Sequence, residues 1–327
     1  MLVVRDDFSA VEGSTVLTVG KFDGLHVGHQ ALIRLVKERA KALGIQAGLV
    51  TFDPHPAAVL RPEHAPPLIT PLPDKLRLLE TWGMDVVAVV TFSRHVAEMK
   101  AAEFLELLWR GLRPQELIVG HDFRFGHRRE GDVQLLRAWA ADRGVAVHVL
   151  APVLVNGERV SGSRIRALIA EGRVEEAVPL LGRPLSVTGP VVEGDQRGRQ
   201  LGVPTANIVP SQAQVVPANG VYVTLVEWDG ACRPGVTNVG VRPTVDGSCL
   251  QVESHVLGWE GNLYGVLLTV HFLHRLRGER KFPSVADLAQ HIKRDIAAAQ
   301  EWFALHGRDL SDRLGAVEQG HNTIYLP

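Results

Sequence analysis

The chain has 327 residues, of which 46% are hydrophobic and 22% are charged, and its formal net charge at pH 7 is −1. This length predicts two domains, and the near-zero charge argues against a general nucleic-acid binder, which needs a basic surface. The chain has two cysteines, no apolar leader segment after Met1 and no uncharged apolar run of about 18 residues, so we expect a cytoplasmic protein without a membrane partner.

Strand and helix patterns alternate from Val16 to about Leu150. Expected strands cover 16–19, 46–52, 85–92, 117–120 and 145–150, and expected helices cover 31–43, 75–81, 97–109 and 133–143. Such alternation predicts a parallel sheet with helices on both faces, in which ligands bind beyond the carboxyl ends of the strands. Two further helices are expected, one between its N-cap Ser161 and Gly172 and one over 174–181.

The second part of the chain favours strands. These are expected at 185–188, 220–228, 233–239, 250–257 and 266–273. Short spacing without intervening helices predicts a small antiparallel barrel. Ser284 is expected to cap a long helix that runs to about Leu305. Near Arg183 the sequence changes from helix patterns to strand patterns separated by Gly, Pro, Asn and Asp. We therefore expect one domain over 1–183 and a second over 184–327.

A glycine-rich turn, Gly-Lys-Phe-Asp-Gly-Leu-His-Val-Gly-His over 20–29, joins the first strand to the first helix. His26 and His29 are three residues apart at the helix start, so both rings can face one object. The helix N-terminus offers unpaired N–H groups and the positive end of the helix dipole, which suit a phosphate chain. The other nucleotide-binding residues expected in this turn are Gly20, Phe22, Asp23, Gly24 and Gly28.

Adenylyl transfer fits these residue types because it needs oriented donors where charge develops on the phosphates, and no protein nucleophile. Arg164 and Arg166, with Ser161 and Ser163, would supply further donors from the other side of the phosphate chain. A single His-x-x-His pair among 14 histidines is more often coincidence than a site, and no third ligand is placed for zinc. The order of strand, turn, helix and distal Ser/Arg helix start favours the nucleotide site.

A second glycine-rich stretch begins at Gly189 and ends with Pro-Thr-Ala-Asn at 204–207. Glycines let backbone N–H groups approach phosphates, and Thr and Asn oxygens suit Mg²⁺. The stretch lacks the Gly-Lys-Ser/Thr ending of a P-loop, and from its residues alone a hairpin with a flexible tip is the commoner structure. Glu253 is either an outward-facing strand residue or a base for an alcohol that attacks the γ-phosphate of ATP.

Four motifs stand in order in the first half of the chain. They are the turn 20–29, Thr-Phe-Asp-Pro-His-Pro over 51–56, Val-Gly-His-Asp-Phe-Arg-Phe-Gly over 119–126 and Ser-Gly-Ser-Arg-Ile-Arg over 161–166. Together they resemble the adenylyltransferase half of the prokaryotic bifunctional riboflavin kinase/FAD synthetase family. The resemblance implies that His26 and His29 bind ATP phosphates and assist the transfer. It also implies that Asp122 and Phe123 lie near the flavin.

Two positions in these motifs differ from the usual family pattern. Lys21 stands where the family usually has a smaller residue, which places an extra cation beside the turn. Gly162 and Ser163 stand in place of the usual Ser-Thr pair, so one hydroxyl and both arginines of that motif are kept.

The motifs of the second half are found at 198–207, 220–222, 235–244, 252–257 and 263–265. They resemble the riboflavin kinase module of the same family. The resemblance implies that Thr205 and Asn207 hold the Mg²⁺ of ATP and that Glu253 is the catalytic base. After Leu257 the family commonly has an acidic residue, whereas Gly-Trp follows here. The nucleotide-binding residues expected in this module are Gly194, Gly198 and Pro204.

The resemblance as a whole implies a bifunctional enzyme of flavin cofactor synthesis. Its fold would be a Rossmann-like nucleotidyltransferase domain followed by an antiparallel riboflavin-kinase barrel with a terminal helix. It would phosphorylate riboflavin to FMN and then transfer AMP to FMN, giving FAD and pyrophosphate, with ATP and Mg²⁺ in both steps.

Two alternatives remain open from the sequence. A different His-x-Gly-His adenylyltransferase, such as a pantetheine-phosphate or nicotinate-nucleotide enzyme, would account for the first half only. A flavin-responsive regulatory protein that has lost turnover would not need the base Glu253. The sequence leaves the oligomeric state open.

Overall fold

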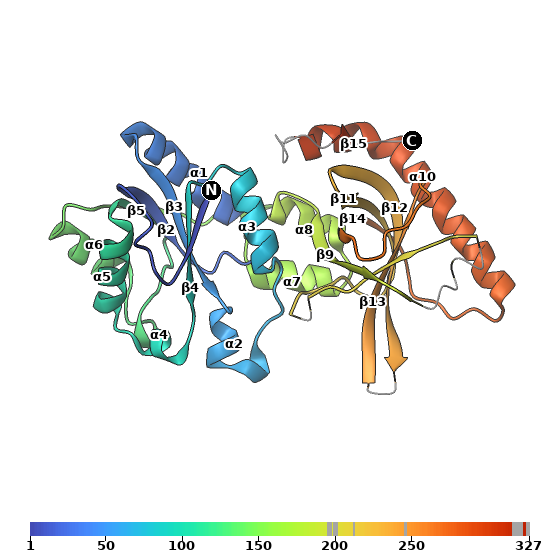
Figure 1. Cartoon of the computed structure of the whole chain (residues 1–327), viewed down its shortest axis with the longest axis horizontal. Coiled ribbons are helices and arrows are strands. Elements are labelled where there is room, and N and C mark those ends of the chain that lie inside the picture. The colour runs from blue at the N-terminus through green and yellow to red at the C-terminus, as the bar shows by residue number, and fades with distance from the viewer. Residues whose placement is uncertain (195–197, 199–201, 212, 245–246, 316–322, 325–327) are drawn as a thin grey trace. The chain divides into compact units, whose positions relative to one another are not determined.

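The computed structural model describes residues 1–194, 198, 202–211, 213–244, 247–315 and 323–324. They form two compact units, one of 1–67 and 72–161 and the other of 68–71 and 162 onward (Figure 1). The expected domain boundary near Arg183 therefore falls inside the second unit. The reason is that helices α7 (Gly162–Ala170) and α8 (Val174–Leu181) are tied to the barrel. Arg275 of the barrel donates a hydrogen bond to the Glu171 carbonyl oxygen at 2.9 Å.

Six parallel strands form the sheet of the first unit, in the spatial order β1-β4-β3-β2-β5-β6. Their bounds are β1 Leu2–Arg5, β2 Thr15–Val19, β3 Gln46–Asp53, β4 Val86–Thr91, β5 Pro114–Gly120 and β6 Ala146–Leu150. The five expected strands are confirmed, and β1 is additional. The chain passes from β2 through β3 to β4 and then returns to β5 on the other side of β2. The switch point of this sheet, where α/β proteins bind ligands, therefore lies between the carboxyl ends of β2 and β5.

Helices cover both faces of this sheet, as the sequence predicts. One core packs residues of α5 and α6 against the strands, and the other packs residues of α1 and α3 against them. The bounds are α1 Val27–Leu43, α2 Pro56–Leu60, α3 Leu72–Thr81, α4 Arg94–Glu98, α5 Ala101–Leu112 and α6 Val133–Ala141, with the short 3-10 helices η1 Pro62–His64 and η2 His127–Arg129. A small hairpin, β7 Leu154–Val155 and β8 Glu158–Arg159, follows β6.

The single helix expected over 97–109 is wrong, because the chain forms two helices there. Ser93 caps α4, accepting the backbone N–H of Val96 at 3.3 Å. The backbone is then extended at Met99 and Lys100 before α5 begins. The side chain of Glu103 accepts the Lys100 backbone N–H at 3.0 Å, which fixes the new helix start.

The second unit is a closed antiparallel barrel with the strand order β11-β14-β9-β10-β13-β12, closed by pairing of β12 with β11. The bounds are β9 Leu185–Val192, β10 Ala206–Ile208, β11 Gly220–Trp228, β12 Ala231–Thr244, β13 Gly247–Val256 and β14 Leu267–Gly278, and β15 Thr323–Ile324 pairs with β12. The expected barrel is confirmed, and β10 is additional.

A long helix, α10 Val285–Gly315, packs Ala299 and Phe303 on the barrel strands. The expected cap is confirmed, because the Ser284 hydroxyl accepts the backbone N–H of Asp287 at 3.1 Å. Inside the barrel a row of buried hydroxyls joins three strands. Thr237 lies 2.7 Å from both Thr224 and Ser254, between oxygen atoms.

Candidate active sites

The two histidines of the turn 20–29 lie together at the start of α1. His26 is the N-cap of the helix, and its Nδ1 accepts the backbone N–H of His29 at 3.4 Å. The two imidazole rings are stacked, with centroids 3.7 Å apart and planes 13° apart. The expectation that both rings share one face is confirmed. Two ring systems and the N-terminus of a 17-residue helix, the positive end of its dipole, thus meet beyond the carboxyl end of β2.

The backbone of this turn takes conformations that few residues adopt. Phe22, Gly24 and Leu25 have φ values of 49°, 82° and 44°, and left-handed backbone is costly for the two residues that carry a Cβ. The Phe22 side chain is 1% exposed and its ring packs against that of His29, with centroids 5.1 Å apart. Any contact between Phe22 and a nucleotide would therefore use its backbone.

The glycines of the turn permit close approach of rings. A Cβ on Gly28 would lie 3.1 Å from the His26 ring, and one on Gly20 would lie 3.2 Å from the Phe22 ring. Asp23 is 6% exposed, so its carboxylate is held inside the turn.

The motif over 51–56 supports the turn from the neighbouring strand. Thr51 is fully buried at the end of β3, and its hydroxyl donates to the Lys21 carbonyl oxygen at 3.0 Å. Asp53 forms an ion pair with Arg5 at 3.1 Å. His55 caps the short helix α2. These contacts give the motif a structural role in addition to any contact with ligand.

The loop after β5 carries the two residues expected near the flavin. Asp122 forms an ion pair with Arg159 at 2.5 Å between oxygen and nitrogen. Partial burial raises the pKa of Asp122, but the hydrogen bond and charge of Arg159, together with a backbone hydrogen bond and the charge of His121, lower it overall, so the carboxylate is ionised at neutral pH. The Phe123 ring stacks on Phe125 with centroids 5.1 Å apart.

An aromatic row that the sequence analysis missed continues behind Phe123. Phe125 lies 6.4 Å from Phe104 of α5, and Phe104 lies 6.2 Å from Phe52 of β3, between ring centroids. These phenylalanines come from three distant segments, so only their packing in the fold reveals the row. It gives the loop after β5 a rigid apolar base.

The second expected group of hydrogen-bond donors to phosphate lies at the start of α7. Ser161 ends the first unit, whereas Ser163, Arg164 and Arg166 belong to the second unit. A Cβ on Gly162 would lie 3.4 Å from the Arg166 guanidinium, so that side chain folds back over the helix start. Two arginines and two hydroxyls therefore stand close together in sequence at one helix N-terminus, a favourable place for anions.

In the barrel, strand register brings the expected kinase residues together. Asn207 of β10 lies directly opposite Glu253 of β13, and Glu253 lies directly opposite Asn238 of β12. Opposite residues point to the same face, so the three side chains form one polar row. Asn238 falls within the motif 235–244 but was not expected as a site residue, because its neighbours across the strands are far away in sequence.

The glycine-rich loop lies close against the two expected metal ligands. A Cβ on Gly194 would lie 2.2 Å from the Asn207 amide nitrogen, and one on Gly198 would lie 3.3 Å from the Thr205 hydroxyl. The Oδ1 atom of Asn207 is buried and accepts no hydrogen bond from the described residues, which fits a hard-cation ligand. Pro204 accepts at its carbonyl oxygen, 2.8 Å from Nδ1 of His255. Residues 199–201 of this motif lie outside the described residues.

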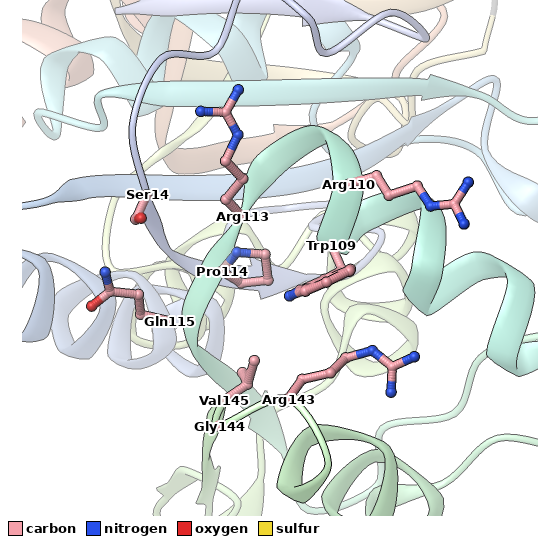
Figure 2. A pocket seen from close by; sticks show the side chains of 9 residues that line it. All are labelled: Ser14, Trp109, Arg110, Arg113, Pro114, Gln115, Arg143, Gly144 and Val145. Carbon is pink, nitrogen blue, oxygen red and sulfur yellow. The ribbon is translucent and has the colours of Figure 1, made fainter.

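A cavity of about 470 Å³ lies at the amino-terminal ends of strands β2, β5 and β6, opposite the ends that carry the expected site residues (Figure 2). Trp109 is one of the residues that line it, and its ring centroid lies 5.5 Å from the Arg143 guanidinium carbon. Arg143 also donates to Glu106 at 3.2 Å. The cavity contains none of the expected site residues, and we do not assign it to either reaction.

Both halves of the chain match family models. Residues 9–164 match the model described as FAD synthetase, and residues 181–303 match the model described as riboflavin kinase. The chain is 39% identical over 298 residues to the bifunctional riboflavin kinase/FMN adenylyltransferase of Escherichia coli (strain K12), covering 90% of this chain and 95% of that protein. The protein of the same name from Pseudomonas fluorescens is 40% identical over 287 residues, covering 87% and 92%.

A solved structure has the same fold. The crystal structure titled as a macrolide-efflux protein from Streptococcus pneumoniae superposes with a TM-score of 0.84 and 30% identity, covering 92% of this chain and all of that one. Among the described residues, no helix has both the length and the apolar character needed to cross a membrane.

The fold and the two matched family models define a two-domain transferase with a nucleotidyltransferase sheet and a kinase barrel. The chain belongs to the bifunctional riboflavin kinase/FMN adenylyltransferase family.

Proposed function

We propose that the turn 20–29 is the site of AMP transfer to FMN and that the polar row on β10 and β13 is the site of riboflavin phosphorylation. The observation that carries the first assignment is the stacked pair of His26 and His29 at the N-terminus of α1, beside the switch point of the sheet. The second assignment rests on the direct opposition of Asn207 and Glu253.

In AMP transfer, a phosphate oxygen of FMN attacks the α-phosphorus of ATP. The bond from that phosphorus to the bridging oxygen breaks, and pyrophosphate leaves. No side chain has to form a covalent bond. The imidazoles of His26 and His29 and the N–H groups of α1 donate hydrogen bonds to oxygens on which negative charge grows in the transition state.

The phosphate chain would receive further donors from the start of α7. Ser161 and Ser163 offer hydroxyls, and Arg164 and Arg166 offer guanidinium groups that can bind phosphate oxygens in pairs. This role rests on residue chemistry and on the family motif.

The loop after β5 is proposed to bind the flavin. Phe123 stacks on Phe125, which packs on the tilted ring of Phe104, so Phe123 can hold a flat ring system without itself moving. Asp122 is fixed by Arg159 in its ionised form, in which it accepts hydrogen bonds.

In the kinase reaction, the Glu253 carboxylate accepts the proton of the primary hydroxyl of riboflavin. The hydroxyl oxygen attacks the γ-phosphorus of ATP, and ADP leaves. Thr205 and Asn207 would hold Mg²⁺, which offsets the negative charge of the ATP phosphates when bound. Gly194, Gly198 and Pro204 bring loop backbone close to these two ligands, where N–H groups can bind phosphate.

One incubation tests the proposal as a whole. Purified protein is mixed with riboflavin, ATP and Mg²⁺, and the flavins are separated by chromatography at several times. We expect FMN to appear first and FAD to follow. Omission of Mg²⁺ should stop both conversions. If neither product forms, the assignment of both sites fails.

Three smaller expectations remain predictions that rest on the sequence. The functional division at residue 183, with α7 and α8 serving the first activity, is one of them. The others are a cytoplasmic location and the absence of nucleic-acid and membrane partners.

A further inference from the structure

A buried lysine lies directly beneath the histidine turn. Lys75 of α3 is 5% exposed, and its ammonium donates to the Lys21 carbonyl oxygen at 2.9 Å and lies 3.2 Å from the Thr51 hydroxyl oxygen. The Thr51 hydroxyl donates to the same carbonyl. Lysine is rarely this deeply buried, because removing its charge from water is unfavourable. Such a position calls for a reason beyond helix packing.

The Lys21 carbonyl, which accepts both hydrogen bonds, lies where it can set the backbone conformation of the turn. It belongs to the peptide group that joins Lys21 to Phe22, the first residue of this turn in the left-handed conformation. Strained backbone persists only where surrounding groups hold it. Two donors from separate elements, α3 and β3, converge on this one oxygen atom. They fix the peptide from which the chain turns toward His26.

The charges around Lys75 come mainly from acidic residues. Asp23 of the turn and Asp53 at the end of β3 both favour its protonated form. Asp53 is itself paired with Arg5. On the same helix, Asp74 lies 3.5 Å from Arg77 between oxygen and nitrogen. The ammonium therefore balances the buried carboxylate of Asp23 inside the turn.

We propose that Lys75 is a positioning residue for AMP transfer, whose ammonium holds the turn in the shape that stacks His26 on His29. It acts through the Lys21 carbonyl and through the charge of Asp23, without touching substrate. This inference rests on the proposed function of the turn 20–29. No role for a residue of α3 was expected from the sequence.

The proposal predicts how the rate of FAD formation depends on pH. Burial lowers the pKa of Lys75 from 10.5 to about 8, although Asp23 and Asp53 act in the opposite direction. Above pH 8 the ammonium loses its proton, and Asp23 loses its balancing charge. FAD formation should therefore decline on the alkaline side with an apparent pKa near 8.

The test compares Lys75→Met with Lys75→Arg and with a matched control, Lys37→Met. Lys37 lies on α1 and donates to the Trp82 carbonyl oxygen, so the control makes the same chemical change away from the turn. For each protein, kcat and KM for AMP transfer to supplied FMN are measured from pH 6 to 10 with ATP and Mg²⁺. Riboflavin phosphorylation by the same sample reports on the second unit.

We expect Lys75→Met to lower kcat about 10- to 100-fold with a smaller change in KM, because displaced catalytic groups act mainly on the chemical step. Its alkaline decline near pH 8 should be absent. The arginine of Lys75→Arg stays charged from pH 6 to 10, so this variant should also lack the alkaline decline. It should keep more activity than Lys75→Met. Lys37→Met should keep both the rate and the pH profile of the parent protein.

Specific results would overturn the inference. A folded Lys75→Met protein with the parent rate and pH profile would remove Lys75 from the mechanism. If that variant does not fold, an unchanged alkaline decline in Lys75→Arg does the same. If neither variant folds, the pH profile of the parent protein is the test. The inference requires its AMP transfer to decline near pH 8 while its riboflavin phosphorylation follows a different profile, and a parent protein without that decline would overturn it. Absence of FAD formation by the parent protein at pH 7 would instead reject the proposed function.

Discussion

Asn207 of β10 lies directly opposite Glu253 of β13 in the antiparallel register of the barrel. The proposed metal ligand and the proposed base are thus neighbours on one face, at the short spacing typical of cross-strand pairs. Register sets this relationship, because a shift of one residue would send one of the two side chains to the opposite face.

Replacement of Glu253 by Gln should separate the two activities. The amide cannot accept the riboflavin proton, so we expect phosphorylation to fall about 100- to 10,000-fold. FMN supplied directly should still become FAD, because the AMP-transfer residues lie in other elements. Both rates are measured by chromatography of the flavins. Equal loss of both in a folded variant would contradict independent sites.

Gly194→Ala should impair phosphorylation by steric displacement of Asn207. The added Cβ would lie 2.2 Å from the Asn207 amide nitrogen, too close for the present packing to remain. We expect the Mg²⁺ concentration for half-maximal phosphorylation to rise, and this is measured by Mg²⁺ titration at fixed ATP. The matched control is Gly278→Ala, whose Cβ would meet its nearest neighbour at 3.8 Å. A parent-like titration for Gly194→Ala would argue against Asn207 as a ligand.

His29→Ala should allow FMN to accumulate without FAD. Loss of one donor to developing charge commonly costs about 100- to 1000-fold in kcat, and the stacked partner of His26 is lost as well. Time courses with riboflavin, ATP and Mg²⁺ follow both products, and the rate of FMN formation serves as the internal control. Undiminished FAD formation would exclude this histidine from the reaction.

Much of the architecture could be predicted from the sequence because it depends on local pattern. Apolar strand runs and amphipathic helices set the parallel sheet, and the cap at Ser284 was recognisable from its neighbours. The break between α4 and α5 was missed, since the apolar pattern continues across it. Strands β1 and β10 have four and three residues, too few for a periodic signal.

The site residues also divide into those that local sequence predicts and those that only the fold brings together. His26 and His29 are close in sequence, so their common direction follows from helix geometry. Asn238 and Lys75 gain meaning only through contacts with distant segments. By sequence Lys75 is an ordinary helix lysine, and its burial follows from how α3 packs against the sheet.

A buried carboxylate on β5 should make the first unit less stable in acid. Glu116 is 5% exposed and accepts from Arg39 at 2.8 Å, and His148 lies 3.0 Å from it. The hydrogen bonds of Arg39 lower the pKa of Glu116 below its ordinary value of 4.5, against the effect of burial. The unfolded chain therefore binds the proton more readily, and this stabilisation is complete above pH 4.5 and lost as pH falls below it.

Glu116→Gln should therefore lower the free energy of unfolding by about 1–2 kcal/mol at pH 7, since charge-assisted hydrogen bonds to a partly exposed Arg39 are lost. The difference from the parent protein should shrink as the pH falls below 4.5. Urea unfolding at each pH measures it. The control is the exposed Glu38→Gln on α1, for which we expect no appreciable change. A difference that is constant with pH would contradict this account of Glu116.

The shared acceptor of Thr51 and Lys75 bears on whether the histidine turn could be moved to another protein. The ten residues 20–29 include both imidazoles, but the donors that hold their backbone come from β3 and α3. A graft of those ten residues onto an unrelated strand–helix junction would lack both donors and should relax into an ordinary loop. A graft that retains its activity would have to carry Thr51 and Lys75, and the strand and helix that present them.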